Sequence, residues 1–267
     1  MKKSEIVTEI FNKRSYLCTG LDTEIGKLPV HIEKNGNGMI QFNREIIEAT
    51  KDFSVAYKIN TAFYEQYGAQ GWEWMAETLS FLPSNTFNIA DAKRGDIGNT
   101  SSMYAKAFFE TLNFDAITVA PYMGEDSLRP FLEFENKTVI CLALTSNPGH
   151  ADFQLQSTGE LKLYERVINT VAKWGNPDNL MFVVGATRAN LVGEIRKLVP
   201  HNFLLVPGVG AQGGSLSEIT KAAANEEVGL LVNSSRGIIY ASNGEDFAHR
   251  AAEEAQKLAS EMSSLMQ

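Results

Sequence analysis

The feature that most constrains the fold is a repeated alternation of short apolar runs with longer stretches of helical periodicity. Most of the runs are nearly all apolar, as parallel strands buried on both faces usually are. Eight runs are predicted to be strands, at residues 16–22, 54–60, 87–91, 116–120, 138–144, 180–185, 203–207 and 229–233. Helical patterns follow them, at about 38–51, 62–82, 98–112, 127–134, 160–174, 189–198, 215–224 and 245–264.

This alternation indicates βα units, in which parallel strands are joined by right-handed crossovers. Eight units in 267 residues predict a closed (β/α)8 barrel, a fold that typically needs ~250 residues. We expect residues 1–267 to form a single domain, with an extra helix at about 4–13 covering the bottom of the barrel. A doubly wound sheet is the alternative architecture.

Two of the predicted helices carry capping-box spacing at their starts. Ser157-x-x-Glu160 precedes the helical pattern at 160–174, and Ser215-x-x-Glu218 opens the pattern at 215–224. In such a box the hydroxyl of the serine accepts a hydrogen bond from the N–H of the glutamate, and the carboxylate of the glutamate accepts one from the N–H of the serine. Both segments are therefore predicted to be helix N-termini.

Composition narrows the class of protein. A hydrophobic fraction of 44% supplies ample core, and a net charge of −8 argues against a general nucleic-acid surface. No run approaches the ~18 apolar residues of a membrane span, and the first residues lack the pattern of a signal peptide. Cys18 and Cys141 lie in apolar strand-like runs, so buried free thiols and a cytoplasmic location are expected.

Polar residues follow the predicted strands, at the end where the active site of such a barrel lies. The third strand runs into Asp91-Ala92-Lys93-Arg94-Gly95-Asp96, the most informative segment of the chain. Residues i and i+2 of a strand share a face, so Asp91 and Lys93 are predicted to point the same way. Burying opposed charges costs free energy unless they are paired, which favours chemistry at this position, although a structural ion pair is possible.

A glycine-rich segment follows the seventh strand and reads Gly208-Val209-Gly210-Ala211-Gln212-Gly213. A dinucleotide fingerprint of this form opens a doubly wound domain with further strands behind it, whereas only one predicted strand follows here. The better interpretation is the phosphate site of a barrel, built from the loops after strands seven and eight. Backbone N–H groups, Gln212 and the planar fork of Arg236 would supply the donors.

The remaining motifs are less informative. His31, His150, His201 and His249 are scattered without metal-ligand spacing. Asn147-Pro148-Gly149 breaks the chain, and the polar stretch that continues to Gly159 is long enough for a lid that orders over a ligand.

Together these residues resemble the orotidine 5′-phosphate decarboxylase family, in its bacterial form with the longer chain. The resemblance covers essentially the whole sequence. Its most specific part is Asp91-Ala92-Lys93-Arg94-Gly95-Asp96-Ile97-Gly98-Asn99-Thr100. The supporting segments are Leu21-Asp22, Tyr57-Lys58-Ile59-Asn60, Pro121-Tyr122-Met123-Gly124, Thr145-Ser146-Asn147-Pro148-Gly149 and Ser235-Arg236-Gly237.

The resemblance implies that orotidine 5′-phosphate is converted to uridine 5′-phosphate and carbon dioxide without a cofactor, in the last step of de novo UMP biosynthesis. It implies catalysis by an alternating array of Lys58, Asp91 and Lys93, with Asp96 reaching the site of a partner subunit in a homodimer. Asp96 lies at an odd offset from Asp91, so nothing forces it onto the face of Asp91 and Lys93. The implied substrate contacts are Asp22, Lys58 and the partner's Thr100 for the ribose, Ser146 for the pyrimidine, Gln212 and Arg236 for the phosphate, and Ile97 beside Asp96.

One departure from the family pattern concerns the loop after the seventh strand. Some members place a tyrosine there over the phosphate, and none lies between Gly208 and Ser215. The segment after Ser146 is therefore expected to supply more of the lid.

Three other functions remain open on the sequence. A metal-dependent phosphosugar decarboxylase or aldolase of the same superfamily would use a similar Asp-x-Lys-x-x-Asp segment around a magnesium ion. A Schiff-base aldolase would use Lys58 or Lys93 as its nucleophile. A non-catalytic nucleotide-binding barrel would keep the fold and bind without turnover.

Overall fold

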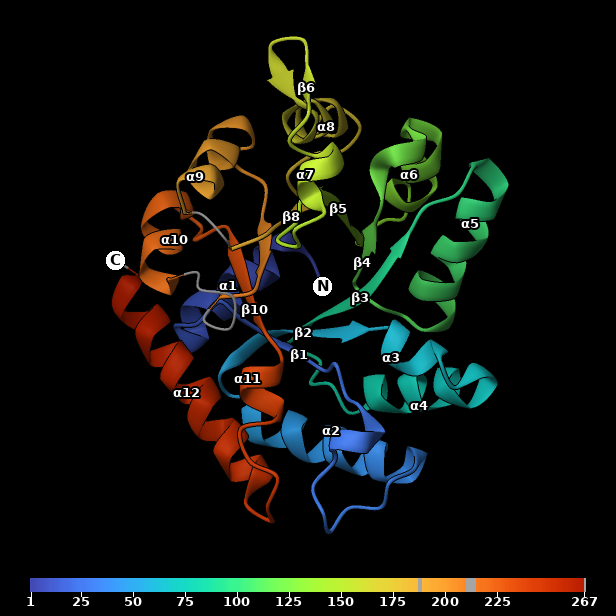
Figure 1. The fold of residues 1–267 in the computed structure, drawn as a ribbon, viewed down its shortest axis with the longest axis vertical. Coiled ribbons are helices and arrows are strands. Elements are labelled where there is room, and N and C mark those ends of the chain that lie inside the picture. Colours follow the sequence, from blue (N-terminus) through green and yellow to red (C-terminus); the bar gives the residue numbers. More distant parts are fainter. Residues whose placement is uncertain (187–188, 210–214, 267) are drawn as a thin grey trace.

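The protein folds into a closed barrel of eight parallel strands surrounded by helices (Figure 1). A computed structural model describes residues 1–186, 189–209 and 215–266. The strands, in their order around the barrel, are β1 (Leu17–Gly20), β10 (Leu230–Ser234), β9 (Leu204–Pro207), β8 (Leu180–Val184), β5 (Thr138–Leu144), β4 (Ala116–Val119), β3 (Phe87–Arg94) and β2 (Ser54–Asn60). The barrel prediction is thus confirmed, and the doubly wound alternative is excluded because the sheet closes on itself.

The helices form the outer layer, as the 3.6-residue patterns predicted. The longer ones are α1 (Lys3–Lys13), α2 (Gly36–Thr50), α4 (Gly68–Ser80), α5 (Gly98–Lys106), α6 (Glu125–Leu132), α8 (Leu163–Val171), α9 (Ala189–Leu198), α10 (Leu216–Ala223) and α12 (Phe247–Leu265). The short ones are η1 (Ile25–Lys27), α3 (Ala62–Glu65), η2 (Ala107–Thr111), η3 (Pro121–Met123), α7 (His150–Phe153) and α11 (Arg236–Ile239). None of the described helices is both long and apolar enough to cross a membrane.

One of the two predicted helix starts is wrong. Ser157 and Thr158 form β6 (Ser157–Thr158), which pairs antiparallel with β7 (Leu161–Lys162). Gly159 makes the turn possible with a φ of 77°, a conformation that favours glycine. The helix starts instead at Leu163, where the Glu165 carboxylate accepts a hydrogen bond from the N–H of Lys162 at 2.7 Å.

The second predicted helix start is confirmed. The hydroxyl of Ser215 accepts a hydrogen bond from the N–H of Glu218 at 3.3 Å, as an N-cap residue does.

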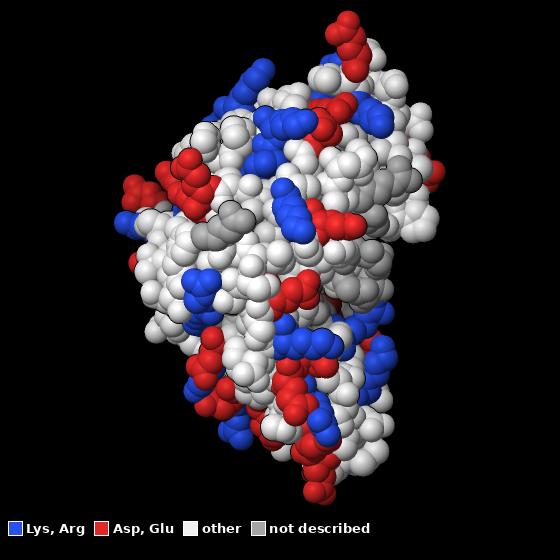
Figure 2. Space-filling view, turned by 90° about the vertical axis from the view of Figure 1, so that its left-hand side faces the viewer, with Lys and Arg blue, Asp and Glu red and all other residues white. Residues whose placement is uncertain are grey.

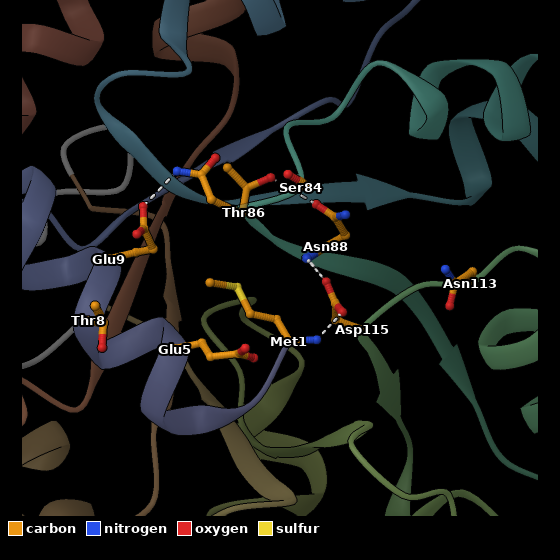
Figure 3. Close-up of a pocket in the computed structure, with 10 residues that line it drawn as sticks. Met1, Glu5, Thr8, Glu9, Ser84, Thr86, Asn88, Asn113 and Asp115 are labelled. Atoms are coloured by element: carbon orange, nitrogen blue, oxygen red, sulfur yellow. Dashed lines mark hydrogen bonds and ion pairs between the residues drawn. The ribbon is translucent and has the colours of Figure 1, made fainter.

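Helix α1 lies across the foot of the barrel, at the N-terminal ends of the strands. Lys13 Nζ donates to the carbonyl of Ser54, the first residue of β2, at 2.8 Å. A hollow of about 600 Å³ separates α1 from β3 and β4 (Figure 3). Across it the α-amino group of Met1 pairs with Asp115 at 2.5 Å, and Asp115 also accepts from the N–H of Asn88 at 2.9 Å. The predicted extra helix at the bottom is therefore present.

Both cysteines lie in the hydrophobic core of the barrel. Cys18 and Cys141 are buried and free, and burial raises the pKa of both thiols, that of Cys18 to about 12, so both stay protonated.

On the face formed by α9, α10 and α12, acidic and basic side chains are interspersed (Figure 2). The described residues of that face form no continuous basic patch of the kind that binds nucleic acid.

A buried arginine ties the foot of the barrel together. Arg196, on α9, donates to the carbonyls of Ala223, Asn202 and Gly229 at 2.7, 2.6 and 2.7 Å. These carbonyls lie at the end of α10 and just before β9 and β10. No carboxylate pairs with it in the described parts of the chain, and burial lowers its pKa to about 10. The guanidinium thus satisfies several buried backbone carbonyls at once.

Replacing Arg196 by methionine should destabilise the barrel, because several buried carbonyls lose their only charged donor. We expect the free energy of unfolding to fall by about 3 kcal/mol, measured by urea denaturation. Arg196→Lys, which keeps one donor group, should lose less. Equal unfolding free energies for Arg196→Met and the wild type would contradict this role.

Candidate active site

The candidate site is a hollow of about 190 Å³ at the carboxyl ends of the strands. It brings together two groups that are far apart in the sequence. The first is Asp22 after β1, Lys58 on β2 and Asp91 on β3, and the second is the loops after β9 and β10. The lining residues are Asp22, Lys58, Asn60, Asp91, Pro207, Gly208, Val209, Asn233, Ser234, Ser235, Arg236 and Gly237. Parallel strands of a barrel present their carboxyl ends on one side, which is why these segments meet.

One wall of the hollow carries Asp22, Lys58 and Asp91, and Lys93 continues this alternating row of four charges beyond the lining residues. Lys58 Nζ lies 3.4 Å from an oxygen of Asp22 and 2.9 Å from an oxygen of Asp91. The other oxygen of Asp91 lies 2.5 Å from Lys93 Nζ. The row is buried at Lys58, whose side chain is 5% exposed, and open at Lys93, whose side chain is 49% exposed. Lys93 is thus the charge that has room to move.

The buried part of the row is held in its ionised form. Burial alone would raise the pKa of Asp91, but the ammonium groups of Lys58 and Lys93 and their hydrogen bonds outweigh it, and this pKa lies well below its usual value. Burial alone would lower the pKa of Lys58, but the carboxylates of Asp91 and Asp22 raise it above its usual value. Both groups are therefore charged across the neutral range.

A bulge in β3 places Lys93. Ala90 pairs with Ile117 of β4 and Arg94 pairs with Val119, so β3 takes four residue steps where β4 takes two. Lys93 has a φ of 49°, which is uncommon for a residue with a side chain and is found at sites of functional strain. Strand alternation correctly predicted that Asp91 and Lys93 meet, but the backbone between them is irregular.

Thr118, on β4, was missed from the sequence. Its buried hydroxyl accepts a hydrogen bond from the N–H of Lys93 at 2.9 Å and donates to the Asp91 carboxylate at 3.0 Å. One hydroxyl therefore links the carboxylate to the backbone of the bulge. A threonine is a favoured residue in any strand, so the only signal was a polar side chain inside an otherwise apolar run.

The loops after β9 and β10, where the phosphate site was predicted, supply the rest of the lining. Arg236 is the first residue of α11, is exposed, and has no ion-pair partner among the described residues. The Asn233 amide donates to the Ser235 hydroxyl at 3.3 Å. A Cβ at Gly20 would lie 1.9 Å from that hydroxyl oxygen, so β1 can approach this loop only with a glycine. Gln212 lies outside the described residues.

Asp96, Ile97 and Thr100 do not line this hollow. The Asp96 carboxylate accepts a hydrogen bond from the N–H of Ile97 at 2.8 Å and forms no ion pair within the described chain. Ile97 is 57% exposed, and Thr100 is exposed at the start of α5. The structure thus separates these three residues from the charged row of their own chain.

Ser146 also lies outside the hollow, directly after β5. The segment that follows it is more structured than a loop, because it contains α7 and the β6–β7 hairpin. Gln154 fastens this segment to Thr145, whose N–H donates to the Gln154 side-chain oxygen at 2.8 Å. A lid role for residues 147–159 stays a prediction.

Within the described residues, no group of three or more His, Cys, Asp or Glu side chains is arranged to hold a metal ion. The described groups of the hollow are the Lys58 ammonium, two carboxylates, an exposed guanidinium, and amide and hydroxyl donors, with the Lys93 ammonium ion-paired beside it. Such a set can bind an anion at one end and stabilise developing negative charge at the other.

Comparison with known proteins gives a consistent result. A family model described as "Orotidine 5'-phosphate decarboxylase / HUMPS family" matches residues 15–251. The chain is 55% identical to an orotidine 5'-phosphate decarboxylase of Flavobacterium johnsoniae, over 100% of this chain and 98% of the relative. It is 54% identical to the protein of that name from Christiangramia forsetii, over 99% and 98% of the two chains.

Solved structures agree with the sequence relatives. The OMP decarboxylase of Leishmania donovani superimposes with a TM-score of 0.86 at 34% identity, covering 100% of this chain and 99% of the other. A putative orotidine-monophosphate decarboxylase of Toxoplasma gondii superimposes with a TM-score of 0.87 at 32% identity, covering 99% and 98%.

The role of Thr118 can be tested without substrate. Thr118→Val keeps the shape but leaves the N–H of Lys93 without its acceptor, so we expect the free energy of unfolding to fall by about 1–2 kcal/mol. Amide hydrogen exchange at Lys93 should also become faster, whereas Thr118→Ser should retain slow exchange. Unchanged exchange at Lys93 in Thr118→Val would show that the hydroxyl does not hold the bulge.

Proposed function

The chain belongs to the orotidine 5′-phosphate decarboxylase family, and from that premise we propose that the hollow converts orotidine 5′-phosphate to uridine 5′-phosphate and carbon dioxide. This is the decarboxylation of de novo pyrimidine biosynthesis, and the proposed site carries it out with its own side chains. The observation that supports the proposal most directly is the ion-paired row Lys58–Asp91–Lys93, whose first two members line one hollow with Arg236.

The difficulty of the reaction is electronic. When the bond from C6 of the pyrimidine to the carboxylate breaks, carbon dioxide leaves and the electron pair remains on C6, in the plane of the ring. The site therefore has to stabilise a localised carbanion with groups that are already in place. We assign this role to Lys93, whose ammonium donates its proton to C6 and is then reprotonated from solvent.

Asp91 is assigned the position facing the substrate carboxylate. Two unit charges ~4 Å apart interact by about 4 kcal/mol at an effective dielectric constant of 20. This repulsion disappears as neutral carbon dioxide departs, so it favours the transition state over the bound substrate. Lys58 and Thr118 hold the Asp91 carboxylate in this orientation through contacts of 2.9 and 3.0 Å.

The remaining roles concern binding. We assign Asp22 and Lys58 to the ribose hydroxyls, Ser146 to the pyrimidine, and Arg236 with Gln212 to the phosphate. The phosphate does not react, but energy from its binding can be used to close the site and exclude water around C6. The guanidinium of Arg236, exposed and without an ion-pair partner among the described residues, suits a bidentate contact with phosphate oxygens.

We further propose a homodimer in which Asp96, Ile97 and Thr100 complete the partner's site. Asp96 has no cation partner in the described part of its own chain, and the partner's Lys93 would supply one. Large apolar side chains are exposed in this segment, in α5 and in η3, with Ile97, Met103 and Tyr122 exposed at 57, 49 and 95%. Exposed apolar side chains grouped near one segment are typical of a subunit interface.

We also propose that residues 1–267 form one barrel domain and that the protein works in the cytoplasm. The continuous ring of eight strands supports the first, and two buried free thiols are in keeping with the second.

The activity is tested by following the loss of absorbance of orotidine 5′-phosphate, with and without a chelator. We expect turnover that the chelator leaves unchanged, and we expect Lys93→Ala to lose it while remaining a folded dimer. Loss of turnover with chelator would favour a metal-dependent phosphosugar enzyme, and borohydride trapping of a substrate adduct would favour a Schiff-base aldolase. Binding without turnover would indicate a non-catalytic nucleotide-binding barrel, and near-normal turnover by Lys93→Ala would refute the mechanism.

Arg236→Ala should weaken binding of phosphorylated ligands selectively, because the guanidinium would contact only the phosphate. We expect affinity for uridine 5′-phosphate to fall by about 2–3 kcal/mol, measured by calorimetry, and affinity for free uridine to stay the same. Equal losses for both ligands would remove Arg236 from the phosphate site.

A further inference from the structure

We propose that Arg94 is a positioning residue that acts on the partner's active site. It would do so by fixing the position of α5, which begins within residues 95–101. We call these residues the arm, and they include Asp96, Ile97 and Thr100. The inference rests on the composite site of the proposed function. Arg94 lies inside the segment Asp91–Asp96, yet it is not part of the charged row and has no role in the proposed mechanism.

The guanidinium of Arg94 is enclosed on several sides. It forms an ion pair with Glu65 of α3, and Nη1 donates to the carbonyl of Ala92 at 2.9 Å. Its carbon Cζ lies 5.5 Å from the ring centre of Tyr104 and 5.4 Å from that of Phe108. Stacking of this kind is worth about 0.5–2 kcal/mol for each partly buried pair.

These contacts hold α5, whose first residues belong to the arm, against the barrel. Arg94 is the last residue of β3, and its carbonyl accepts the N–H of Ala120 at 2.8 Å. Tyr104 belongs to α5, the helix that starts within the arm, and Phe108 lies in η2 directly after it. One planar group therefore connects β3, α3 and the far end of the arm's helix.

Within the arm itself, the backbone is held by Ser101. The Ser101 hydroxyl lies 2.6 Å from the carbonyl oxygen of Asp96 and 2.9 Å from that of Ser127 on α6. Ser101 thus sets the local fold of the arm, while Arg94 sets the position of α5 against the barrel. Neither contact involves the carboxylate of Asp96, which within the described residues accepts only the N–H of Ile97.

The clamp has a cost that a purely stabilising residue would avoid. Arg94 Nε is buried and finds no acceptor among the residues that the structure describes. An unsatisfied buried donor costs about 1–3 kcal/mol. Arg94 pairs with Glu65 and not with Asp91, so its removal leaves the charged row of its own chain intact. A residue kept at such a cost, outside its own site, is best explained by what it positions.

The consequence is a defect that appears in the other subunit. Arg94→Met keeps an unbranched side chain but removes the charge and the planar stacking. A loosened α5 would misplace Asp96 and Thr100 in the partner's site, and a misplacement of ~1 Å can cost about 100-fold in rate. We therefore expect kcat/KM of the Arg94→Met homodimer to fall about 100-fold, while Arg94→Lys, which keeps the charge, loses less.

Hybrid dimers test the direction of this effect. Two variants with different affinity tags are co-expressed, and the mixed dimers are isolated by successive affinity steps. A hybrid of Lys93→Ala with Arg94→Met contains one site built from an intact Lys93 and an intact arm. It should show about half of the wild-type activity, since one of its two sites is complete. A hybrid of Asp96→Asn with Arg94→Met contains no such site and should stay as low as the Arg94→Met homodimer.

The control hybrid combines Lys93→Ala with Asp96→Asn and should also recover about half of the activity if the site is composite. Failure of this control overturns the composite site and the clamp together. Success of the control overturns only the clamp if Lys93→Ala with Arg94→Met stays inactive while Asp96→Asn with Arg94→Met recovers, because Arg94 then acts in its own site. Wild-type activity of the Arg94→Met homodimer also overturns it.

Arg250→Met is the matched control for loss of an ion-paired arginine. Arg250 pairs with Asp246 and Glu253 near the start of α12, on the opposite side of the barrel from α5 (Figure 1). It should leave kcat/KM unchanged. If Arg94→Met folds poorly, Arg94→Lys in the same hybrids gives the same two contrasting patterns with a smaller amplitude.

Discussion

The ammonium of Lys58 is the charge on which the rest of the site depends. An isolated ammonium at 5% exposure would be expensive to bury, and it is stable here because Asp22 and Asp91 flank it. These carboxylates come from the segment after β1 and from β3, the two neighbours of β2 in the barrel. The ion pairs therefore require the closed parallel register, and the barrel in turn fixes the row of charges before any substrate arrives.

Solvent exposure increases along this row, and the increase suits the proposed chemistry. Lys58, Asp91 and Lys93 are 5, 12 and 49% exposed, so the inner charges are fixed and the outer one is accessible. The bulge in β3 produces this gradient, because it lifts Lys93 out of the regular ladder while the Thr118 hydroxyl holds its N–H. A buried, ion-paired carboxylate beside a solvent-accessible ammonium suits a site in which the first is held in place and the second exchanges its proton with solvent.

The parts of this site that follow from strand periodicity could be predicted from the sequence. All eight strands and the family were predicted correctly, and the contact between Asp91 and Lys93 followed from the two-residue period. The bulge, Thr118 and the enclosure of Arg94 could not be predicted, because each depends on which residues of β4, α3 and α5 lie opposite. The error at Ser157 has a similar cause, since the turn at Gly159 and pairing with Leu161 outweighed a local capping signal.

The segment from Asp91 to Asp96 links catalysis to assembly in the proposed dimer. Asp91 faces its own Lys58 and Lys93, whereas Asp96 lies beyond Gly95, where a Cβ would come within 2.9 Å of the carbonyl oxygen of Ala120. This close passage carries the chain out of the barrel, and the Asp96 carboxylate has no cation partner among the described residues. In the proposed dimer, a lone subunit would hold Lys93 by one carboxylate, and association would supply the second. Since a charge fixed by two opposed partners is better oriented than one fixed by a single partner, dimerisation itself becomes part of the preorganisation of the site.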